Sequence, residues 1–373
     1  MTLATMRYVL PSRADEGLRH RRDTDPAAGG FAMSMSRPLY CIDAGGSGTS
    51  VRAWNGECWS LPSVNPSSVG QDSSDATLTG LFRRIRTHAE RGSERAGDTS
   101  ARPAIWLASA SVDRATAAVE LRRCTAAARA AGLDAEIVVT NDVTPLILGA
   151  PPDTGHVVTV CGTGSAFLGT NGRSAPVRVG GCEYLGSDEG SAFDLGLRGL
   201  RAAVCGLDGR GQRTALSELL TVEAGIPVPE LARKLARMPF PKAAVAALAP
   251  VVLRAWLDGD LAAADLVDAV IGELVIGIRT ARDAAAVSPG WHLSVAGGVV
   301  NGCPDFFHKV AVTATGIGAR HVMLVSDTTT VLLGALARLA VTDPMNLSDP
   351  RIDEEAWYID LAGRTIDLHG KTG

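Results

Sequence analysis

Closely spaced cysteine pairs are missing from this 373-residue sequence, although it contains seven cysteines. The seven are odd in number and scattered, and none forms a Cys-x-x-Cys motif. This pattern argues against a disulfide framework, a structural zinc site and an iron–sulfur cluster. We therefore expect reduced thiols and a cytoplasmic protein.

An excess of basic residues is also missing, because the formal net charge is −4. Aromatic residues make up 5% of the chain and are not interleaved with a basic stripe. Nucleic acid is therefore not an expected partner. No apolar run is long enough for a signal sequence or a membrane span, so we expect no membrane association either.

The composition that remains is typical of a globular enzyme, with 46% hydrophobic and 20% charged residues. A chain of this length usually outgrows a single hydrophobic core, which favours two domains with a cleft between them. We expect a disordered extension over residues 1–36, a first lobe over 37–150, a second lobe over 151–342 and a C-terminal tail over 343–373.

Two segments share one construction, in which a glycine-rich turn joins two stretches of apolar and β-branched residues. The first lies at residues 38–54 and the second at residues 156–170. Both patterns predict two strands joined by a turn, of which a β-hairpin is the simplest form. Their recurrence indicates a duplicated unit.

Helical and extended patterns alternate along the rest of the chain, which predicts an α/β fold. The stretch 91–102 is polar and is expected to be a loop, and a helix at 328–340 is expected in the second lobe. The other predicted helices lie around residues 78–85, 115–131, 193–204 and 265–286, and the other strands at 105–108, 136–140 and 293–295.

The first glycine turn has the residue types that bind phosphate. Its glycines leave backbone N–H groups accessible, and hydroxyl side chains lie beside them. Asp43, at the end of the preceding strand, is placed to hold a hydrated Mg²⁺. The alternative is a tight hairpin whose glycines only supply positive φ. The candidate phosphate ligands are Gly45, Gly46, Ser47, Gly48 and Thr49.

The second glycine turn, Gly162-Thr163-Gly164-Ser165, is similarly suited to phosphate contacts. Neither turn is a P-loop, because the G-x-x-x-x-G-K-[ST] motif is absent. Neither fits the dinucleotide-binding fingerprint, because extended residues follow the glycines where that motif needs a helix. Together the two turns predict a nucleotide whose β- and γ-phosphates are held from both sides.

Asp142 lies between the two turns and follows the predicted strand at residues 136–140, where α/β proteins place ligands. Phosphoryl transfer to an alcohol needs a carboxylate that accepts the hydroxyl proton, and Asp142 is the candidate for this general base. Its alternative role is to cap a helix after Asn141. Asp188 and Glu189 precede a predicted helix and also have two interpretations, as ligands of sugar hydroxyls or as helix caps.

Taken in order, these motifs resemble the N-acetylglucosamine kinase branch of the BadF/BadG/BcrA/BcrD ATPase family, in the actin–Hsp70–sugar kinase superfamily. The likeness runs over about residues 40–340. It implies two actin-like, ribonuclease H-like lobes, each a mixed sheet flanked by helices, with ATP and Mg²⁺ as cofactors. It also implies phosphorylation of a hydroxyl of an amino sugar, of the N-acetylglucosamine or glucosamine type. A homodimer is the assembly that we consider.

The resemblance also assigns roles to individual residues. Asp142 corresponds to the family's catalytic base, Thr163 to a nucleotide contact and Asp43 to the acidic residue of the first phosphate motif. The adenosine residues that it implies are Ala296, Gly297 and Gly298. The substrate residues that it implies are Asn65, Ser165, Gly181, Cys182, Glu183 and Asp188.

One loop departs from the family pattern. Where the family has Gly-Gly-Trp-Gly, this sequence has Gly180-Gly181-Cys182-Glu183, and Ser187 replaces a further glycine. We therefore expect a rebuilt substrate wall, with glucosamine, another amino sugar or a cyclitol as alternative substrates. One hypothesis is that Glu183 pairs with an ammonium group of the substrate.

Two other functions fit parts of the pattern. One is an ATPase that activates a partner, as the dehydratase activators of the broader family do through a shared cluster, but the chain lacks the closely spaced cysteines for it. The other is a non-enzymatic regulator that binds sugar or nucleotide, although a helix-turn-helix extension is missing. Release of ADP that depends on added sugar distinguishes the kinase from both.

Overall fold

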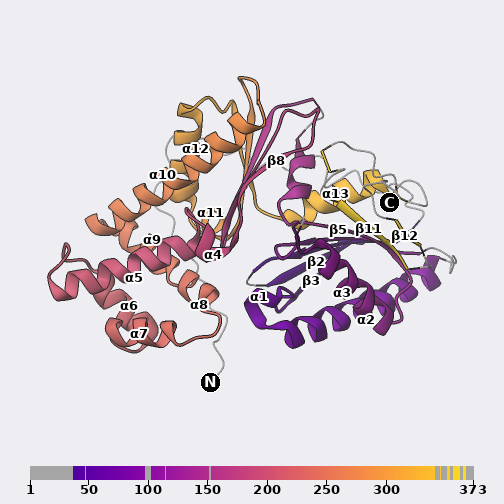
Figure 1. Ribbon diagram of the computed structural model, residues 1–373, viewed down its shortest axis with the longest axis horizontal. Coiled ribbons are helices and arrows are strands. Elements are labelled where there is room, and N and C mark those ends of the chain that lie inside the picture. The colour runs from indigo at the N-terminus through magenta and orange to yellow at the C-terminus, as the bar shows by residue number, and fades with distance from the viewer. Residues whose placement is uncertain are drawn as a thin grey trace. The chain divides into compact units, whose positions relative to one another are not determined.

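The computed structural model describes residues 37–46, 48–96, 102–113, 115–150, 153–340, 345, 351–352, 356–361 and 364–366. The predictions for residues 1–36 and for Ser47 lie outside the described residues. Two mixed β-sheets with helices packed on them make up the described chain (Figure 1). This is the α/β architecture with two lobes that the sequence predicts.

The first sheet has seven strands in the order β12-β11-β5-β4-β1-β2-β3. Strands β1, β2 and β3 form an antiparallel meander, while β4 runs parallel to β1 and β5 runs parallel to β4. The hairpin β1–β2 contains the first glycine turn, as predicted. The strands are β1 Leu39–Ala44, β2 Thr49–Ala53, β3 Cys58–Leu61, β4 Ala104–Ser109, β5 Glu136–Thr140, β11 Ala356–Asp360 and β12 Arg364–Ile366.

The second sheet has five strands in the order β10-β9-β6-β7-β8. Its strands β6, β7 and β8 form an antiparallel meander, and β9 and β10 follow in parallel. This order repeats β5-β4-β1-β2-β3 of the first sheet, which supports the duplicated unit inferred from the two glycine turns. The strands are β6 His156–Cys161, β7 Ser165–Thr170, β8 Val177–Gly180, β9 His292–Ala296 and β10 His321–Val325.

Helix α2 packs on the first sheet through the apolar residues that predict it. Leu78, Leu81, Phe82 and Ile85 are completely buried in one core with β1 and β4. The helix continues to Ala96, so the loop expected from residue 91 starts later, because arginine, glutamate and alanine in this stretch favour a helix. The helices of this part are α1 Pro66–Val69, α2 Gln71–Ala96, α3 Ala117–Ala130 and the 3-10 helix η1 Thr144–Gly149.

The helices of the second lobe include a group of short ones that follow α5. Gly196 of α5 lets α8 come close, because a Cβ atom at this position would lie 2.1 Å from the carbonyl oxygen of Val245. This packing fixes α8, which starts at Lys242, against α5. The helices are α4 Glu183–Gly186, α5 Ala192–Asp208, α6 Leu216–Ala224, α7 Val228–Ala236, α8 Lys242–Ala246, α9 Ala249–Leu257, α10 Leu261–Ala284, α11 Gly298–Gly302 and α12 Pro304–Gly316.

After β10 the chain returns to the first sheet. Helix α13, Thr328–Leu339, packs against β1, β2 and η1, and β11 then pairs with β5 in antiparallel register. Both elements lie beside the strands of the first sheet in Figure 1. The expectation that this helix belongs to the second lobe is therefore wrong. Its apolar face predicts burial but does not specify which sheet it covers.

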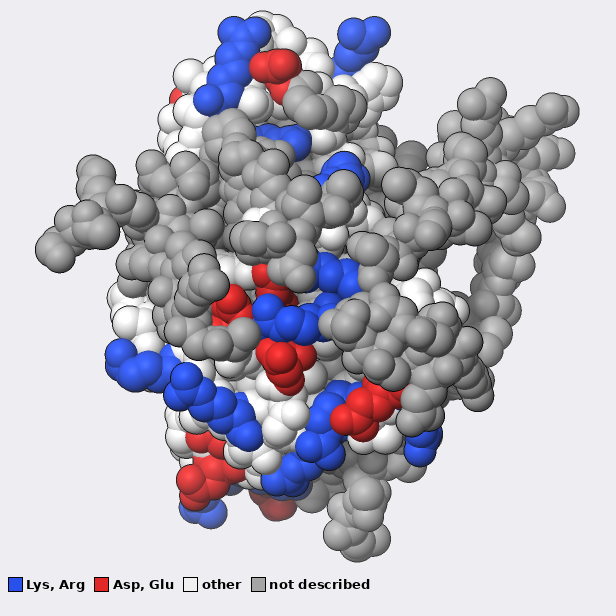
Figure 2. Space-filling model, turned by 90° about the vertical axis from the view of Figure 1, so that its right-hand side faces the viewer, with Lys and Arg blue, Asp and Glu red and all other residues white. Residues whose placement is uncertain are grey.

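None of the helices in the described ranges has both the length and the apolar character needed to cross a membrane. On the face of the first lobe drawn in Figure 2, acidic and basic side chains of the described residues are interspersed. The expectation that nucleic acid is not a partner stays a prediction.

Candidate active site

A cavity of about 510 Å³ collects nearly all of the residues that the sequence singles out. Both sheets contribute to its lining, at the turns and strand ends that carry the motifs. Two predicted residues are exceptions: Ser47 lies outside the described residues, and Cys182 is exposed and does not line the cavity. The predicted residues that do line it are Asp43, Gly45, Gly46, Gly48, Thr49, Asn65, Asp142, Gly162, Thr163, Gly164, Ser165, Gly181, Glu183, Asp188, Ala296, Gly297 and Gly298.

The two glycine turns face each other across this cavity. A Cβ atom on Gly46 would lie 3.8 Å from the Cβ atom of Thr163, so the turns approach within ordinary contact distance. Gly297 lies against the second turn and has a φ of 114°, and a Cβ atom there would lie 2.4 Å from the carbonyl oxygen of Cys161. Only glycine fits that position. The three motifs therefore converge on one place.

The second glycine turn is joined to the loop that carries Asp188. The backbone N–H of Ser165 donates to Oδ1 of Asp188 at 3.0 Å, and the Ser165 hydroxyl donates to the carbonyl oxygen of Glu189 at 2.6 Å. Gly164 allows this contact, because a Cβ atom there would lie 2.5 Å from the Asp188 carboxylate. Asp188 itself is only 3% exposed. The turn and the acidic loop thus form one unit.

Asp142 follows β5 on a turn that is held by its neighbour. The Asn141 amide donates to the carbonyl oxygen of Val112 at 2.8 Å, and the Asn141 carbonyl accepts from the N–H of Val143 at 3.1 Å. Asn141 therefore makes the local turn contacts, and the N-cap residue of η1, Val143, makes no side-chain cap hydrogen bond within the described part of the chain. The Asp142 carboxylate lines the cavity.

The electrostatic surroundings of Asp142 favour its protonated form. Burial and then the nearby negative charge of Asp43 raise the pKa of Asp142 to about 6, while the positive charges of Arg178 and Lys242 oppose the shift. A carboxyl with a pKa near the working pH can both take and release a proton. This is the property expected of a general base.

Asp43 lies at the carboxyl end of β1 and accepts a hydrogen bond from the hydroxyl of Thr328, at the start of α13. Burial raises the pKa of Asp43, the Thr328 hydrogen bond opposes the shift, and the charge of Asp327 adds to it. Among the described residues there is no group of three or more His, Cys, Asp or Glu side chains that could hold a metal ion. Mg²⁺ does not need one, because it is usually held by one or two carboxylates together with phosphates and water. Asp43 fits such a site.

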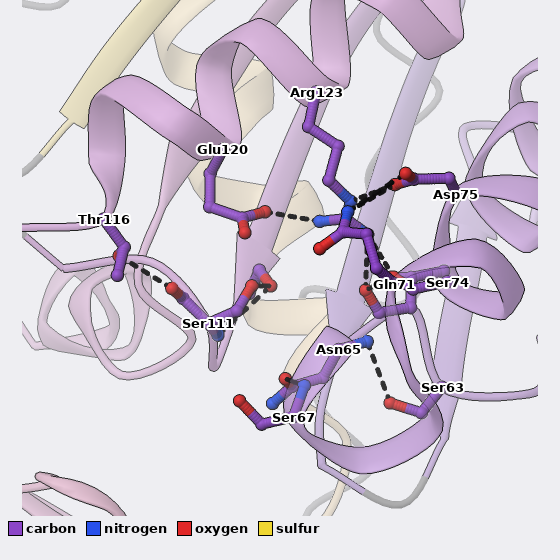
Figure 3. Close-up of polar contacts among 12 residues, drawn as sticks. Ser63, Asn65, Ser67, Gln71, Ser74, Asp75, Ser111, Thr116, Glu120 and Arg123 are labelled. Atoms are coloured by element: carbon purple, nitrogen blue, oxygen red, sulfur yellow. Dashed lines mark hydrogen bonds and ion pairs between the residues drawn. The ribbon is translucent and has the colours of Figure 1, made fainter.

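Asn65 lines the cavity from the first lobe. Figure 3 shows the polar contacts that hold the chain around it. Its side-chain carbonyl caps α1 by accepting from the N–H of Ser67 at 2.9 Å, and among the described residues its amide nitrogen has no protein partner. Arg123 of α3 donates to the carbonyl oxygen of Val64 at 2.6 Å and pairs with Asp75 of α2. Two helices thereby fix the backbone that presents Asn65.

The sequence-based prediction lacks Ser50 of β2 and Ser60 of β3, which also line the cavity, and three residues from more distant elements. These three are Arg178, Lys242 and Thr328. Arg178 also lines a second cavity of about 450 Å³, together with Asn141 and Trp357. Each is brought in by a tertiary contact, from β8, α8 and α13 respectively. The one available signal is that lysine is rare in this chain, which has four, but rarity does not indicate a place in the fold.

The altered loop keeps a defined conformation. The N–H of Cys182 donates to the Ser187 hydroxyl at 2.7 Å, so the serine that replaces a family glycine closes the loop. Glu183 has a φ of 64° and its carboxylate contacts the Lys242 ammonium at 2.9 Å. The hypothesis that Glu183 is available to a substrate ammonium therefore needs revision, because the protein already supplies a cation to it.

The repeated five-strand order, with a glycine turn in each sheet facing the other, defines the actin-like fold. The profile of the BadF/BadG/BcrA/BcrD ATPase family matches residues 110–304, which is more than half of the sequence. The chain therefore belongs to the BadF/BadG/BcrA/BcrD ATPase family, as its motifs predict.

Similarity to individual proteins points to the same group. The N-acetylmuramic acid/N-acetylglucosamine kinase of Clostridium acetobutylicum is 28% identical over 175 residues, which cover 46% of this chain and 57% of that protein. The match therefore spans little more than half of the relative's length.

Two solved structures share the fold. A proposed N-acetylglucosamine kinase from Chromobacterium violaceum has a TM-score of 0.60 at 22% identity, over 80% of this chain and 99% of that one. A proposed N-acetylglucosamine kinase from Porphyromonas gingivalis has a TM-score of 0.58 at 19% identity, over 79% and 97% of the two chains. At these identities the likeness establishes the architecture only.

Proposed function

We propose that this protein is an ATP-dependent kinase that phosphorylates a hydroxyl of an amino sugar of the N-acetylglucosamine or glucosamine type. The observation that carries the proposal is the place of Asp142, a carboxyl with a pKa near 6 in the cavity where both glycine turns meet. Membership of an ATPase family and the names of the similar proteins support the same reaction class.

The nucleotide lies along the three glycine motifs. The glycines of the two turns, Gly45, Gly46, Gly48, Gly162 and Gly164, line the cavity without side chains, which lets phosphate oxygens approach the backbone closely. The residues Ala296, Gly297 and Gly298 face the adenosine part. Because Gly162 contacts Gly297, with a Cβ-to-Cα distance of 3.9 Å for a side chain built there, one nucleotide reaches both motifs.

Asp43 is the residue that would hold the metal, with Thr328 fixing the orientation of its carboxylate. When bound, Mg²⁺ neutralises charge on the β- and γ-phosphates and so makes the transfer easier. Asp43 also acts on Asp142, because its charge helps to raise the pKa of that carboxyl.

The sugar lies between Asp142 and the acidic loop. A carboxylate oxygen of Asp142 accepts the proton of the attacking hydroxyl as the bond to phosphorus forms. The free amide of Asn65 and the carboxylate of Asp188 orient other hydroxyls of the ring, and Gly181 and Ser165 line the same side. Closure of the lobes over both substrates would exclude water and limit hydrolysis of ATP.

Another sugar or a cyclitol is the alternative substrate, and the departure at Cys182 and Glu183 is the observation that favours it. An ATPase that activates a partner protein is the other alternative. A screen that couples ADP release to a spectroscopic readout, across amino sugars, neutral sugars and cyclitols, distinguishes these functions. ADP release that no small hydroxylated compound stimulates would overturn the proposed kinase.

The Asp142→Asn variant tests the assigned base. Asparagine keeps the shape of the side chain but cannot accept the proton, so we expect kcat to fall by about 10²-fold to 10⁴-fold. Binding of ATP, measured by titration calorimetry, should be largely retained. A variant with full activity would show that another group takes the proton.

A further inference from the structure

Lys242 projects from the start of α8 into the cavity, where it connects the two acidic residues of the substrate wall. Its ammonium lies 2.8 Å from Oδ2 of Asp188 and 2.9 Å from Oε2 of Glu183. Asp188 is almost completely buried, and among the described residues Oδ2 of its carboxylate has no hydrogen-bond partner apart from this ion pair. Lys242 is therefore the cation that pairs with both carboxylates.

The backbone at both acidic residues has a conformation that side chains usually avoid. Glu183 has a φ of 64° and Asp188 has a φ of 76°, in the left-handed region. A side chain there costs free energy, and such strain is kept where the surrounding structure imposes it. At position 183 the family pattern has glycine, whereas this chain has a glutamate with a left-handed backbone within ion-pair distance of Lys242. The ion pair therefore involves the one residue of this pair at which the chain is known to depart from the family pattern, Glu183.

The ammonium stays charged in this setting. Burial lowers the pKa of Lys242, but its contacts with Asp188 and Glu183 raise it by more, so its pKa lies above the ordinary value. A substrate ammonium entering the same place would meet this like charge, and it would find both carboxylates already paired. A neutral acetamido or hydroxyl group would meet neither obstacle.

We propose that Lys242 determines specificity by selecting sugars with a neutral substituent, such as an acetamido group, over sugars with a free ammonium group. This inference rests on the proposed sugar kinase function. It reverses the hypothesis that Glu183 pairs with a substrate ammonium. Lysine at this position takes the place of that ammonium.

The experiment compares kcat/KM for N-acetylglucosamine and glucosamine at a pH where the sugar amine is protonated. The unaltered enzyme should prefer N-acetylglucosamine. In Lys242→Met the ammonium is gone and both carboxylates are vacant, so the ratio should move towards glucosamine by about tenfold or more. Lys242→Arg keeps the charge and should keep the ratio. Lys234→Met is the matched control, because Lys234 is exposed on α7 and does not line the cavity.

The Glu183→Gln variant gives a second test with the opposite sign. Removing one carboxylate leaves the ammonium less neutralised, so the ratio should move further towards N-acetylglucosamine. An unchanged ratio in folded Lys242→Met would overturn the proposal, as would a shift of Glu183→Gln towards glucosamine. Glu183→Gln also decides the matter if Lys242→Met fails to fold.

A failure of the kinase function is seen separately, as absence of sugar-dependent ADP release in the unaltered protein. Titration calorimetry of the two sugars then still measures the preference in binding. Equal affinity for both sugars, or binding of neither, would overturn the role of Lys242.

Discussion

Single residues set the chemistry of this site, and Asp142 shows most clearly how neighbouring groups change the pKa of a side chain. Its carboxyl is placed by Asn141, which takes over the local turn contacts, and its pKa is raised by burial and by Asp43. Arg178 and Lys242 act in the opposite direction from elements remote in sequence. The reactivity of one aspartate therefore depends on both lobes.

The pH dependence of activity follows from this arrangement. A general base must be deprotonated, so kcat/KM should fall about tenfold per pH unit below a midpoint near pH 6. Arg178 lowers the pKa of Asp142, so Arg178→Gln should move the midpoint to higher pH. Arg173→Gln, which alters an exposed arginine five residues away in the chain, should leave it unchanged. A midpoint that does not respond to Arg178→Gln would contradict the assigned electrostatics.

At the level of elements, local patterns predict local structure well. The strand β5 at Glu136–Thr140 agrees with its prediction residue for residue, and both glycine hairpins form where expected. Their signals lie within a few neighbouring residues. Strand β8, by contrast, has only four residues, all partly buried, and it is absent from the prediction because so short a stretch gives little pattern.

The missing parts of the prediction depend on distant contacts. Helix α13 shows its apolar face in the sequence, but only packing decides that this face covers β1 and not the second sheet. Lys242 and Arg178 are likewise charged residues without a motif, and they become part of the site because α8 and β8 carry them there. The glycine motifs of the site can be predicted from the sequence, whereas its positively charged residues, Lys242 and Arg178, cannot.

Strand β11 is an integral part of the first sheet, although the sequence suggests a polar tail. Ile359 is 1% exposed, so Ile359→Ala should lower the free energy of unfolding by about 2 to 4 kcal/mol. Val119→Ala removes a similar side chain that is 54% exposed on α3, and should change stability by less than about 0.5 kcal/mol. Urea unfolding measures both. Equal effects would show that β11 does not contribute to the fold.

For the whole molecule, a buried histidine links stability to pH. His156 is 1% exposed, its Nε2 lies 2.9 Å from the Ser294 hydroxyl, and burial lowers its pKa to about 4. The folded state keeps the ring neutral, whereas the unfolded chain binds a proton near pH 6.5. The unfolded state therefore gains protons first as the pH falls, and stability is lost between about pH 6.5 and pH 4.

The loss assigned to His156 amounts to about 3 kcal/mol over that range. It is measured as the difference in urea-unfolding free energy between the unaltered protein and His156→Gln at several pH values. The difference should shrink as the pH falls, because the variant has no imidazole to protonate. A difference that is independent of pH would remove His156 from the explanation.

The return of the chain to the first sheet has a consequence for synthesis on the ribosome. The second sheet is built from one continuous stretch, β6 to β10, and can be completed as soon as that stretch has emerged. In the first sheet, β5 has no pairing partner on one side until α13 and β11 have been translated. The lobe that starts first therefore finishes last, and its unpaired edge is the part of the nascent protein most in need of protection from aggregation.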